Sequence, residues 1–170
     1  MIAIGQTLPA GEFTFITAEG KQLKDTQALF AGKKVVLFAV PGAFTPTCSN
    51  AHLPGYVVLA DQFKAKGVDA LYCLSVNDAF VMKAWQAAQN ADAITMLADG
   101  DGSWTQALGL AKETGAFGGL RAQRFALIAN DGVVEQLFVE ARGAVAVLGF
   151  AHARLQRAEH AEFALDGDAA

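Results

Sequence analysis

The stretch that decides the fold is KVVLFAV at residues 34–40, which is followed at once by Pro41 and Gly42. A short, continuous apolar run that ends at such a turn is typical of a strand buried on both faces of a sheet. A second run of this kind, ALYCLSV at residues 70–76, follows a helical stretch that ends near residues 66–67. The order strand, helix, strand predicts that the two strands pair in parallel. The sequence therefore indicates an α/β fold.

The segment after the second strand predicts another crossover unit of the same kind. Asn77 or Asp78 is expected to cap a helix that runs through residues 80–85. A short apolar run at residues 94–98 follows this helix and is expected to form a further strand of the sheet.

The later part of the chain predicts an antiparallel pair of strands. Residues 123–129 and 133–139 are both strand-like, and Asn-Asp-Gly at 130–132 separates them. Because these three residue types tolerate positive φ angles, they favour a tight hairpin turn. We expect a final helix over residues 145–161, before a polar tail at 166–168 that frays.

Length and composition are those of one globular domain, which we expect to span residues 1–170. The chain has 170 residues, of which 53% are hydrophobic and 18% charged, and this is not the composition of a disordered protein. The formal net charge of −4 gives no general attraction for phosphate backbones or anionic lipids. Nucleic-acid and membrane partners are therefore not expected.

The N-terminal residues predict a cytoplasmic protein. They lack a charged region followed by a long apolar stretch, and no apolar run in the sequence approaches the length of a membrane span. The two cysteines, Cys48 and Cys73, are too few for a disulfide framework, and their spacing is neither C-x-x-C nor that of a zinc ligand pair. We expect a reducing compartment, in which local surroundings decide whether each thiol is structural or reactive.

The segment Thr-Pro-Thr-Cys at residues 45–48 reads as the start of a helix. Thr45 is expected at the N-cap and Pro46 at the first helical position, where a missing N–H and a fixed φ are favourable. Cys48 then lies in the first turn, where unpaired N–H groups and the helix dipole stabilise a thiolate. The alternative is that Cys48 is a small buried residue. Its placement after a central strand, where ligands of open α/β folds bind, favours a nucleophile.

These residues resemble the active-site signature of peroxiredoxins, in which Pro41, Thr45 and Cys48 have the P-x-x-x-T-x-x-C spacing. The fuller string at residues 41–49 is similar to the type-five subfamily. Three further segments also resemble it: HLPG at 52–55, CLSVNDAF at 73–80 and Arg-Phe at 124–125. The similarity spans roughly residues 2–140, whereas residues 141–170 follow the family pattern poorly.

The resemblance implies a thioredoxin-like fold, with three layers and a central mixed sheet flanked by helices. It also implies that the Cys48 thiolate attacks a peroxide and becomes a sulfenic acid. Thr45 would donate its hydroxyl to the thiolate or to the peroxide, and Pro41 would shield the sulfur from water. Arg124 would favour the thiolate and stabilise charge on the leaving oxygen. The N–H of Cys48 would complete the oxygen site.

The implied activity is that of a one-Cys peroxidase that reduces hydrogen peroxide and small alkyl hydroperoxides without a metal or an organic cofactor. The sulfenic acid must then be reduced by an external thiol, either glutathione with glutaredoxin or thioredoxin. The resemblance also implies a homodimer formed through the loops around the active site. The rival from another class is a redox sensor or chaperone-like protein that is switched by Cys48 oxidation.

Several neighbouring residues have a structural interpretation as the better alternative. Arg121 competes with Arg124, but only Arg124 precedes Phe125 as in the family. His52 follows Cys48 by four residues, so a Cys–His pair or a metal site is conceivable, although a structural hydrogen bond is favoured. Cys73 lies within an apolar strand, where burial makes a poor thiolate, so a resolving role is not favoured. A C-x-x-C oxidoreductase is disfavoured because Ala51 stands at the second Cys position.

Overall fold

A computed structural model of the protein describes residues 1–140. The helix predicted over residues 145–161 and the polar tail at 166–168 lie outside the described residues. In chain order, the elements are β1 (Glu12–Thr17), β2 (Gly20–Asp25), α1 (Thr26–Phe30), β3 (Lys34–Ala39), a helical turn (Cys48–His52), α2 (Leu53–Ala65), β4 (Ala70–Ser75), α3 (Ala79–Ala88), β5 (Thr95–Ala98), α4 (Ser103–Ala107), β6 (Ala111–Glu113), a second helical turn (Gly115–Phe117), β7 (Leu120–Ala122), β8 (Phe125–Asn130) and β9 (Val133–Val139).

The central sheet has five strands in the order β5-β4-β3-β8-β9. Strands β3, β4 and β5 run in parallel. Strand β8 is antiparallel to β3, and β9 is antiparallel to β8. The predicted parallel pairing, the strand near residues 94–98 and the antiparallel pair are therefore all confirmed. The carboxyl end of β3 lies between the carboxyl end of β4 and the start of β8. Residues that are far apart in the sequence therefore meet at this end of the sheet.

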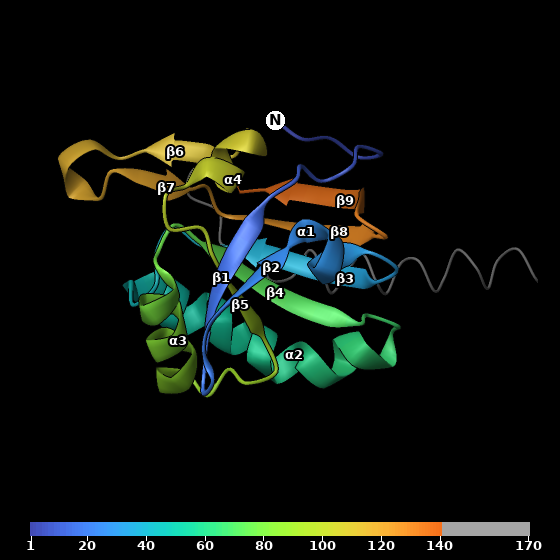
Figure 1. Cartoon of the computed structure of the whole chain (residues 1–170), viewed down its shortest axis with the longest axis horizontal. Coiled ribbons are helices and arrows are strands. Elements are labelled where there is room, and N and C mark those ends of the chain that lie inside the picture. Colours follow the sequence, from blue (N-terminus) through green and yellow to red (C-terminus); the bar gives the residue numbers. More distant parts are fainter. Residues whose placement is uncertain (141–170) are drawn as a thin grey trace, which may run out of the picture.

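Side chains of the central strand alternate between two apolar cores. Val36 and Phe38 belong to the core that α2 and α3 cover. Val35, Leu37 and Ala39 belong to the other core, together with side chains from α1, α4 and β1. Figure 1 shows α2 and α3 along one side of the sheet and α1 across the other. The predicted arrangement of a mixed sheet between two layers of helices is confirmed.

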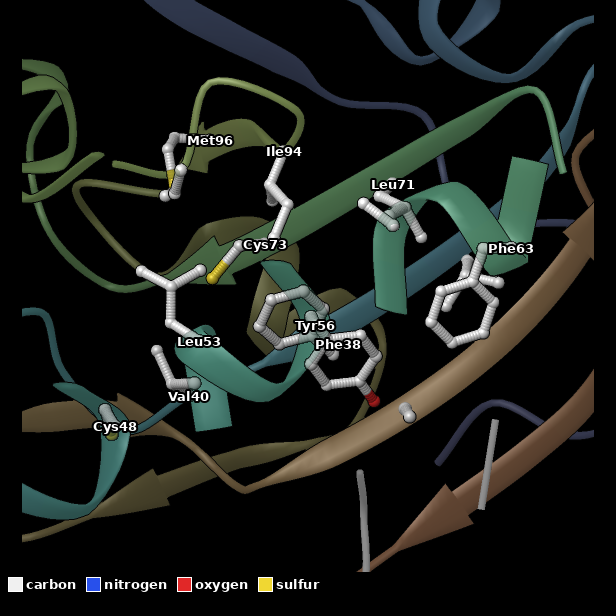
Figure 2. Packing of buried hydrophobic residues seen from close by; sticks show 14 of the residues in the cluster. Phe38, Val40, Cys48, Leu53, Tyr56, Phe63, Leu71, Cys73, Ile94 and Met96 are labelled. Carbon is white, nitrogen blue, oxygen red and sulfur yellow. The ribbon is translucent and has the colours of Figure 1, made fainter. Parts of the chain in front are cut away.

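The core between the sheet and α2 is built around stacked rings. Phe38 and Tyr56 lie parallel with their ring centroids 3.8 Å apart, and burial of each large side chain contributes about 1.5–3 kcal/mol. Figure 2 shows Cys73 inside this group, close to Leu53 and Ile94, while Cys48 lies at the margin of the view. The two thiols of the protein therefore belong to one apolar cluster but occupy different parts of it.

The caps and turns follow the residue types that the sequence provides. Asp78 caps α3, since its carboxylate accepts a hydrogen bond from the N–H of Val81 at 2.8 Å. Asp131 and Gly132 have φ angles of 50° and 75°, which are the positive values that a tight hairpin turn requires. Both features agree with the sequence-based predictions. Among residues 1–140, none of the helices combines the length and the apolar character needed to cross a membrane.

Several elements were not predicted from the sequence. The hairpin of β1 and β2 precedes the central sheet, and all six residues of β2 are exposed. The three-residue strands β6 and β7 form a separate ribbon, which Figure 1 shows beside α4. A wholly exposed strand and strands of three residues have no apolar alternation for sequence analysis to detect.

Candidate active site

The loop after β3 is braced by the neighbouring strand. The N–H of Val40 donates to the carbonyl of Leu74 at 3.0 Å, which extends the pairing of β3 with β4. The side-chain oxygen Oδ1 of Asn77 then accepts two hydrogen bonds, from the N–H of Ala43 at 3.0 Å and from the hydroxyl of the fully buried Ser75 at 2.7 Å. The Asn77 amide therefore fixes the path of the chain toward the first turn of the next helix.

Thr45 follows a strained residue and turns its hydroxyl back into the loop. Phe44 has a φ of 60°, a left-handed conformation that is uncommon for a bulky residue and that concentrates at functional sites. The Thr45 hydroxyl donates to the carbonyl of Gly42 at 2.7 Å. Because a hydroxyl has one proton, the proton is in use and the Thr45 oxygen offers its lone pairs as an acceptor. This differs from the expectation that Thr45 donates to the thiolate or the peroxide.

The helix that carries Cys48 begins where it was predicted. Helical structure starts at Pro46, and the N–H of Ser49 donates to the carbonyl of Thr45 at 2.9 Å. The N–H of Cys48 thus belongs to the first turn, whose donors have no intrahelical acceptor. The following turn is a π-helix, in which the N–H of Leu53 donates to the carbonyl of Cys48. Such single π turns occur mostly inside α-helices and frequently at functional sites.

Arg124 supplies a positive charge beside the sulfur of Cys48. Its Nη1 lies 3.5 Å from the Cys48 Sγ, and the Cys48 side chain is only 1% exposed. A guanidinium keeps its charge at any pH at which the protein is folded. Screening by water is weak at such a buried position, so the charge of the guanidinium acts strongly on any negative charge that develops at this sulfur.

The guanidinium of Arg124 is itself held from two sides. Its Nε lies 2.8 Å from the Oε2 of Glu140, and the main chains of the two residues are joined by the N–H of Glu140 donating to the Arg124 carbonyl at 2.9 Å. Its Nη1 also lies 2.9 Å from the Nδ1 of His52. Because a guanidinium can only donate, the His52 Nδ1 is the acceptor in this contact. Arg124 therefore has a fixed orientation toward Cys48.

His52 is a neutral partner of this cation. Burial, and secondly the charge of Arg124, lower the pKa of His52 from 6.5 to about 4. Since Nδ1 accepts from Arg124, the ring proton is assigned to Nε2, which is buried and has no partner among the described residues. The predicted structural hydrogen bond of His52 is confirmed, with Arg124 as its partner. No group of three or more His, Cys, Asp or Glu side chains within residues 1–140 is arranged to hold a metal ion.

Trp85 links helix α3 to the turn that carries Cys48. Its indole N–H donates to the hydroxyl of Ser49 at 3.0 Å, and the Trp85 side chain is fully buried. Trp85 is thus a core residue, and it also anchors the residue next to Cys48.

The surroundings of Cys73 are apolar. Cys73 is fully buried in the middle of β4, where it pairs with Phe38 and Met96 on the two neighbouring strands. Burial, and secondly the nearby Cys48 sulfur, raise the pKa of the Cys73 thiol well above its usual value. The interpretation of Cys73 as a structural, poorly ionised thiol agrees with this geometry.

Arg121, the competitor of Arg124, points elsewhere. Its Nε donates to the carbonyl of Gly118 at 2.8 Å and its Nη1 to the carbonyl of Pro41 at 3.4 Å. The structure therefore brings Arg124 and Thr45 to the Cys48 turn, whereas Arg121 bonds to the carbonyl of Pro41, at the start of the loop that leads to Cys48. The predicted shielding of the sulfur by Pro41 stays a prediction.

Three contacts of the site were not predicted from the sequence. Glu140 had no signal beyond its position after an apolar strand, and Asn77 was interpreted only as a helix cap. His52 was recognised as a residue on the face of Cys48, but its contact with Arg124 joins positions 72 residues apart. Contacts of this kind depend on strand register, which the local sequence does not specify.

Comparisons with known proteins agree with this arrangement. The family model described as Redoxin matches residues 3–148. Peroxiredoxin-2C of Oryza sativa subsp. japonica is 48% identical over 151 residues, which cover 87% of this chain and 93% of the relative.

Solved structures give the same result. Reduced Prx3 of Vibrio vulnificus in complex with hydrogen peroxide is 64% identical, with a TM-score of 0.83, and the match covers 85% of this chain and 91% of that one. Peroxiredoxin 5 of Alvinella pompejana is 32% identical, with a TM-score of 0.81, and the match covers 92% of this chain and 99% of that one.

Proposed function

We propose that Cys48 is the peroxidatic residue of this protein. The chain belongs to the redoxin family as a type-five peroxiredoxin with a thioredoxin-like fold, and it is a cysteine-dependent peroxidase. The single observation that carries the proposal is the contact of 3.5 Å between the Cys48 Sγ and the fixed guanidinium of Arg124. Among residues 1–140, the influences on the Cys73 thiol are burial and the Cys48 sulfur, and both disfavour its thiolate. The similarity to peroxidases favours turnover over the alternative of a redox sensor.

The proposed step is a displacement at oxygen. The Cys48 thiolate attacks the terminal oxygen of the hydroperoxide, and an S–O bond forms as the O–O bond breaks. Cys48 becomes a sulfenic acid, and the leaving oxygen takes a proton to become water from hydrogen peroxide or an alcohol from an alkyl hydroperoxide. The sulfur is oxidised and the peroxide is reduced by two electrons.

Each neighbour of Cys48 has a physical task in this step. Arg124 stabilises the thiolate and then the negative charge that develops on the leaving oxygen. The Thr45 oxygen, whose proton is held by the Gly42 carbonyl, accepts the O–H of the peroxide. The first-turn N–H of Cys48 donates to a peroxide oxygen. Pro41, at the head of the loop, limits access of water to the sulfur.

We assign the one-Cys mechanism because the second thiol is poorly placed for resolution. Cys73 is fully buried within β4, and its raised pKa leaves little thiolate to attack a sulfenic acid. An external thiol therefore reduces the oxidised Cys48, either glutathione with glutaredoxin or thioredoxin. No metal or organic cofactor takes part in this proposal, and the cytoplasm is the proposed compartment.

A homodimer formed through the loops around the active site is also proposed. Phe44, Phe80 and Phe117 are 55%, 70% and 91% exposed, and large exposed apolar groups that lie together mark interaction surfaces. The segments that carry them are linked: Asn77, just before the helix α3 that carries Phe80, binds Ala43 next to Phe44, and Arg121 joins the loops of Phe44 and Phe117. Sedimentation of the wild type and of Phe117→Ser tests this surface, and an unchanged mass would contradict it.

The test of the proposed function is peroxide consumption by matched variants. With glutathione and glutaredoxin, or with thioredoxin and its reductase, the wild type should consume hydrogen peroxide over many cycles. Cys48→Ser should lose this activity, and Cys73→Ser should keep it. Full activity in Cys48→Ser would exclude Cys48 as the peroxidatic residue. Loss of turnover in a folded Cys73→Ser protein would exclude the one-Cys mechanism, and comparison of the two reducing systems identifies the reductant.

A further inference from the structure

The β6–β7 ribbon carries two positive charges directly opposite each other. Lys112 on β6 pairs with Arg121 on β7 in the antiparallel register. Residues directly opposite in such a pair have side chains on the same face, and like charges in this position are destabilising. The chain has a net charge of −4, so two adjacent cations are not a consequence of its overall composition.

No carboxylate neutralises these charges within residues 1–140. The hydrogen bonds of Arg121 go to two main-chain carbonyls, those of Gly118 and Pro41, and no ion pair joins Arg121 or Lys112 to an acid in this part of the chain. Glu113 is the neighbouring acid on the ribbon, and its carboxylate accepts from the N–H of Gly115 at 2.9 Å. Within residues 1–140, no ion pair therefore compensates the positive charge at this position.

The Arg121 guanidinium is held in a fixed position. Both loops come close to this group: a Cβ at Gly118 would lie 2.8 Å from its Nε, and a Cβ at Gly42 would lie 3.0 Å from its Nη1. Two of its five N–H donors are used by the carbonyls, and three remain. A planar fork of free donors matches the geometry of a carboxylate.

This charge lies beside the loop that leads to Cys48. Pro41 and Gly42 contact Arg121 on one side. The same Gly42 contacts Thr45 through its carbonyl, which accepts the Thr45 hydroxyl at 2.7 Å, and Cys48 follows three residues later. An anion bound to Arg121 would thus lie against the loop that leads to Cys48.

We propose that Arg121 and Lys112 bind the carboxylate of the small thiol that reduces the oxidised Cys48. This inference rests on the proposed function, because it names the chemical class of the reductant at the same site. A thiol that carries a carboxylate is held at the loop while its sulfur reaches the sulfenic acid. Hydrogen peroxide has no carboxylate, so this site acts in the reduction of Cys48 by the thiol and not in its oxidation by peroxide.

The reductive step balances with two molecules of thiol. The first thiol attacks the Cys48 sulfenic acid, an S–S bond forms, and the hydroxyl leaves as water with the thiol proton. A second thiol attacks the mixed disulfide, which releases the Cys48 thiol and a disulfide of the two small molecules. The two small thiols thereby return to Cys48 the two electrons that it gave to the peroxide.

The test is a set of three simple thiols that differ in charge. Full-length protein is oxidised with one equivalent of hydrogen peroxide and then mixed with 3-mercaptopropionate, 2-mercaptoethanol or cysteamine, which are anionic, neutral and cationic. The sulfenic acid that remains at each time is trapped and measured by mass spectrometry. The variants are Arg121→Gln, Arg121→Lys and Lys112→Gln, with Lys33→Gln as a matched loss of a cation at the opposite end of β3.

We expect Arg121→Gln to lower the ratio of the rate constants for the anionic and neutral thiols roughly tenfold, as for loss of a charged hydrogen bond. Lys112→Gln and Arg121→Lys should lower this ratio less, and Lys33→Gln should retain the wild-type ratio. The rate with the cationic thiol, relative to the neutral one, should rise in Arg121→Gln. The intrinsic reactivity of each thiol cancels when the same ratio is compared between proteins.

An equal loss with all three thiols would overturn the proposal and leave Arg121 as a brace between two loops. A loss confined to a carboxylate-bearing hydroperoxide in the oxidation step would overturn the assignment to the reductant. Failure of the underlying function is distinguishable, because the wild type would then form no sulfenic acid at Cys48 before any thiol is added.

Discussion

Cys48 and Cys73 are 25 positions apart in one chain, both are almost completely buried, and both belong to the same apolar cluster. They differ in the charges and dipoles around them. Cys48 lies in the first turn of a helix, 3.5 Å from the Nη1 of Arg124, whereas Cys73 is surrounded by apolar strands and its pKa is raised. The two thiols therefore differ in their surroundings rather than in their exposed area. We propose that the buried sulfur beside the fixed cation is the more reactive one.

The same contrast extends to what holds each residue in place. Cys73 is fixed by strand pairing and packing, which an apolar residue would satisfy equally well. Cys48 is surrounded by polar contacts that run from Glu140 through Arg124 to His52, with Trp85 bound to the adjacent Ser49. Removal of these contacts should make the two thiols more alike.

The largest expected effect is that of Arg124→Gln. This change removes the charge that distinguishes Cys48 from Cys73, and loss of one such stabilising group costs about 10²–10³ in rate. The second-order rate constant for oxidation by hydrogen peroxide, measured in single turnover, checks it. Arg124→Lys is the matched control, because it keeps the charge but loses the planar guanidinium. Its rate constant should lie between those of the wild type and of Arg124→Gln. An unchanged rate in Arg124→Gln would remove the electrostatic distinction.

The next effect concerns pH and His52. The folded pKa of about 4 lies below the ordinary 6.5, so between these values the unfolded chain binds a proton that the folded protein does not. This contribution to the free energy of unfolding is therefore complete above about pH 6.5 and is lost as the pH falls toward 4. The whole pKa shift corresponds to on the order of 3 kcal/mol.

Denaturant unfolding of the wild type and of His52→Asn across this pH range measures the contribution. Asparagine keeps an acceptor for Arg124 but does not titrate, so the loss of stability on acidification should be smaller in the variant. Equal losses in the two proteins would show that His52 is not the group responsible.

A smaller effect is expected from Cys73→Ser. The substitution places a hydroxyl without a partner in an apolar strand, which costs about 1–3 kcal/mol in measured proteins. The free energy of unfolding should fall by this amount, while peroxide consumption continues. Retained stability together with lost activity would reverse the roles that we assign to the two thiols.

The smallest effect is that of Ser49→Ala. It removes the hydrogen bond from the Trp85 indole at 3.0 Å and should lower the free energy of unfolding by about 1 kcal/mol. Ser49→Thr keeps the hydroxyl and is the control. If Ser49→Ala and Ser49→Thr unfold at the same denaturant concentration, the bond to Trp85 does not stabilise the turn that carries Cys48.

The parts of this account that sequence predicted are those written in local patterns. The apolar run before Pro41 predicted the central strand, and the helix start at Pro46 predicted the position of Cys48. The Asn-Asp-Gly turn predicted the β8–β9 hairpin. In each case a few adjacent residues contain the whole signal, because burial on both faces, a fixed φ and a positive φ are properties of single positions.

The remaining parts depend on register and distance. The Glu140 contact with Arg124 follows from the pairing of β8 with β9, and the Asn77 contact with Ala43 follows from the ends of two adjacent strands. The direction of the Thr45 hydroxyl was predicted differently, since the accepting carbonyl of Gly42 is set by the loop conformation. Sequence patterns report which residues are available, and the fold decides which of them meet.

The most direct test of the central claim is the site of first oxidation. Wild-type protein, reduced and then exposed to one equivalent of hydrogen peroxide in the presence of a sulfenic-acid trap, is digested and analysed by mass spectrometry. We predict one adduct per chain, carried by the peptide that contains Cys48, with Cys73 recovered as an unmodified thiol. An adduct on Cys73, or equal modification of both thiols, would contradict the distinction between them.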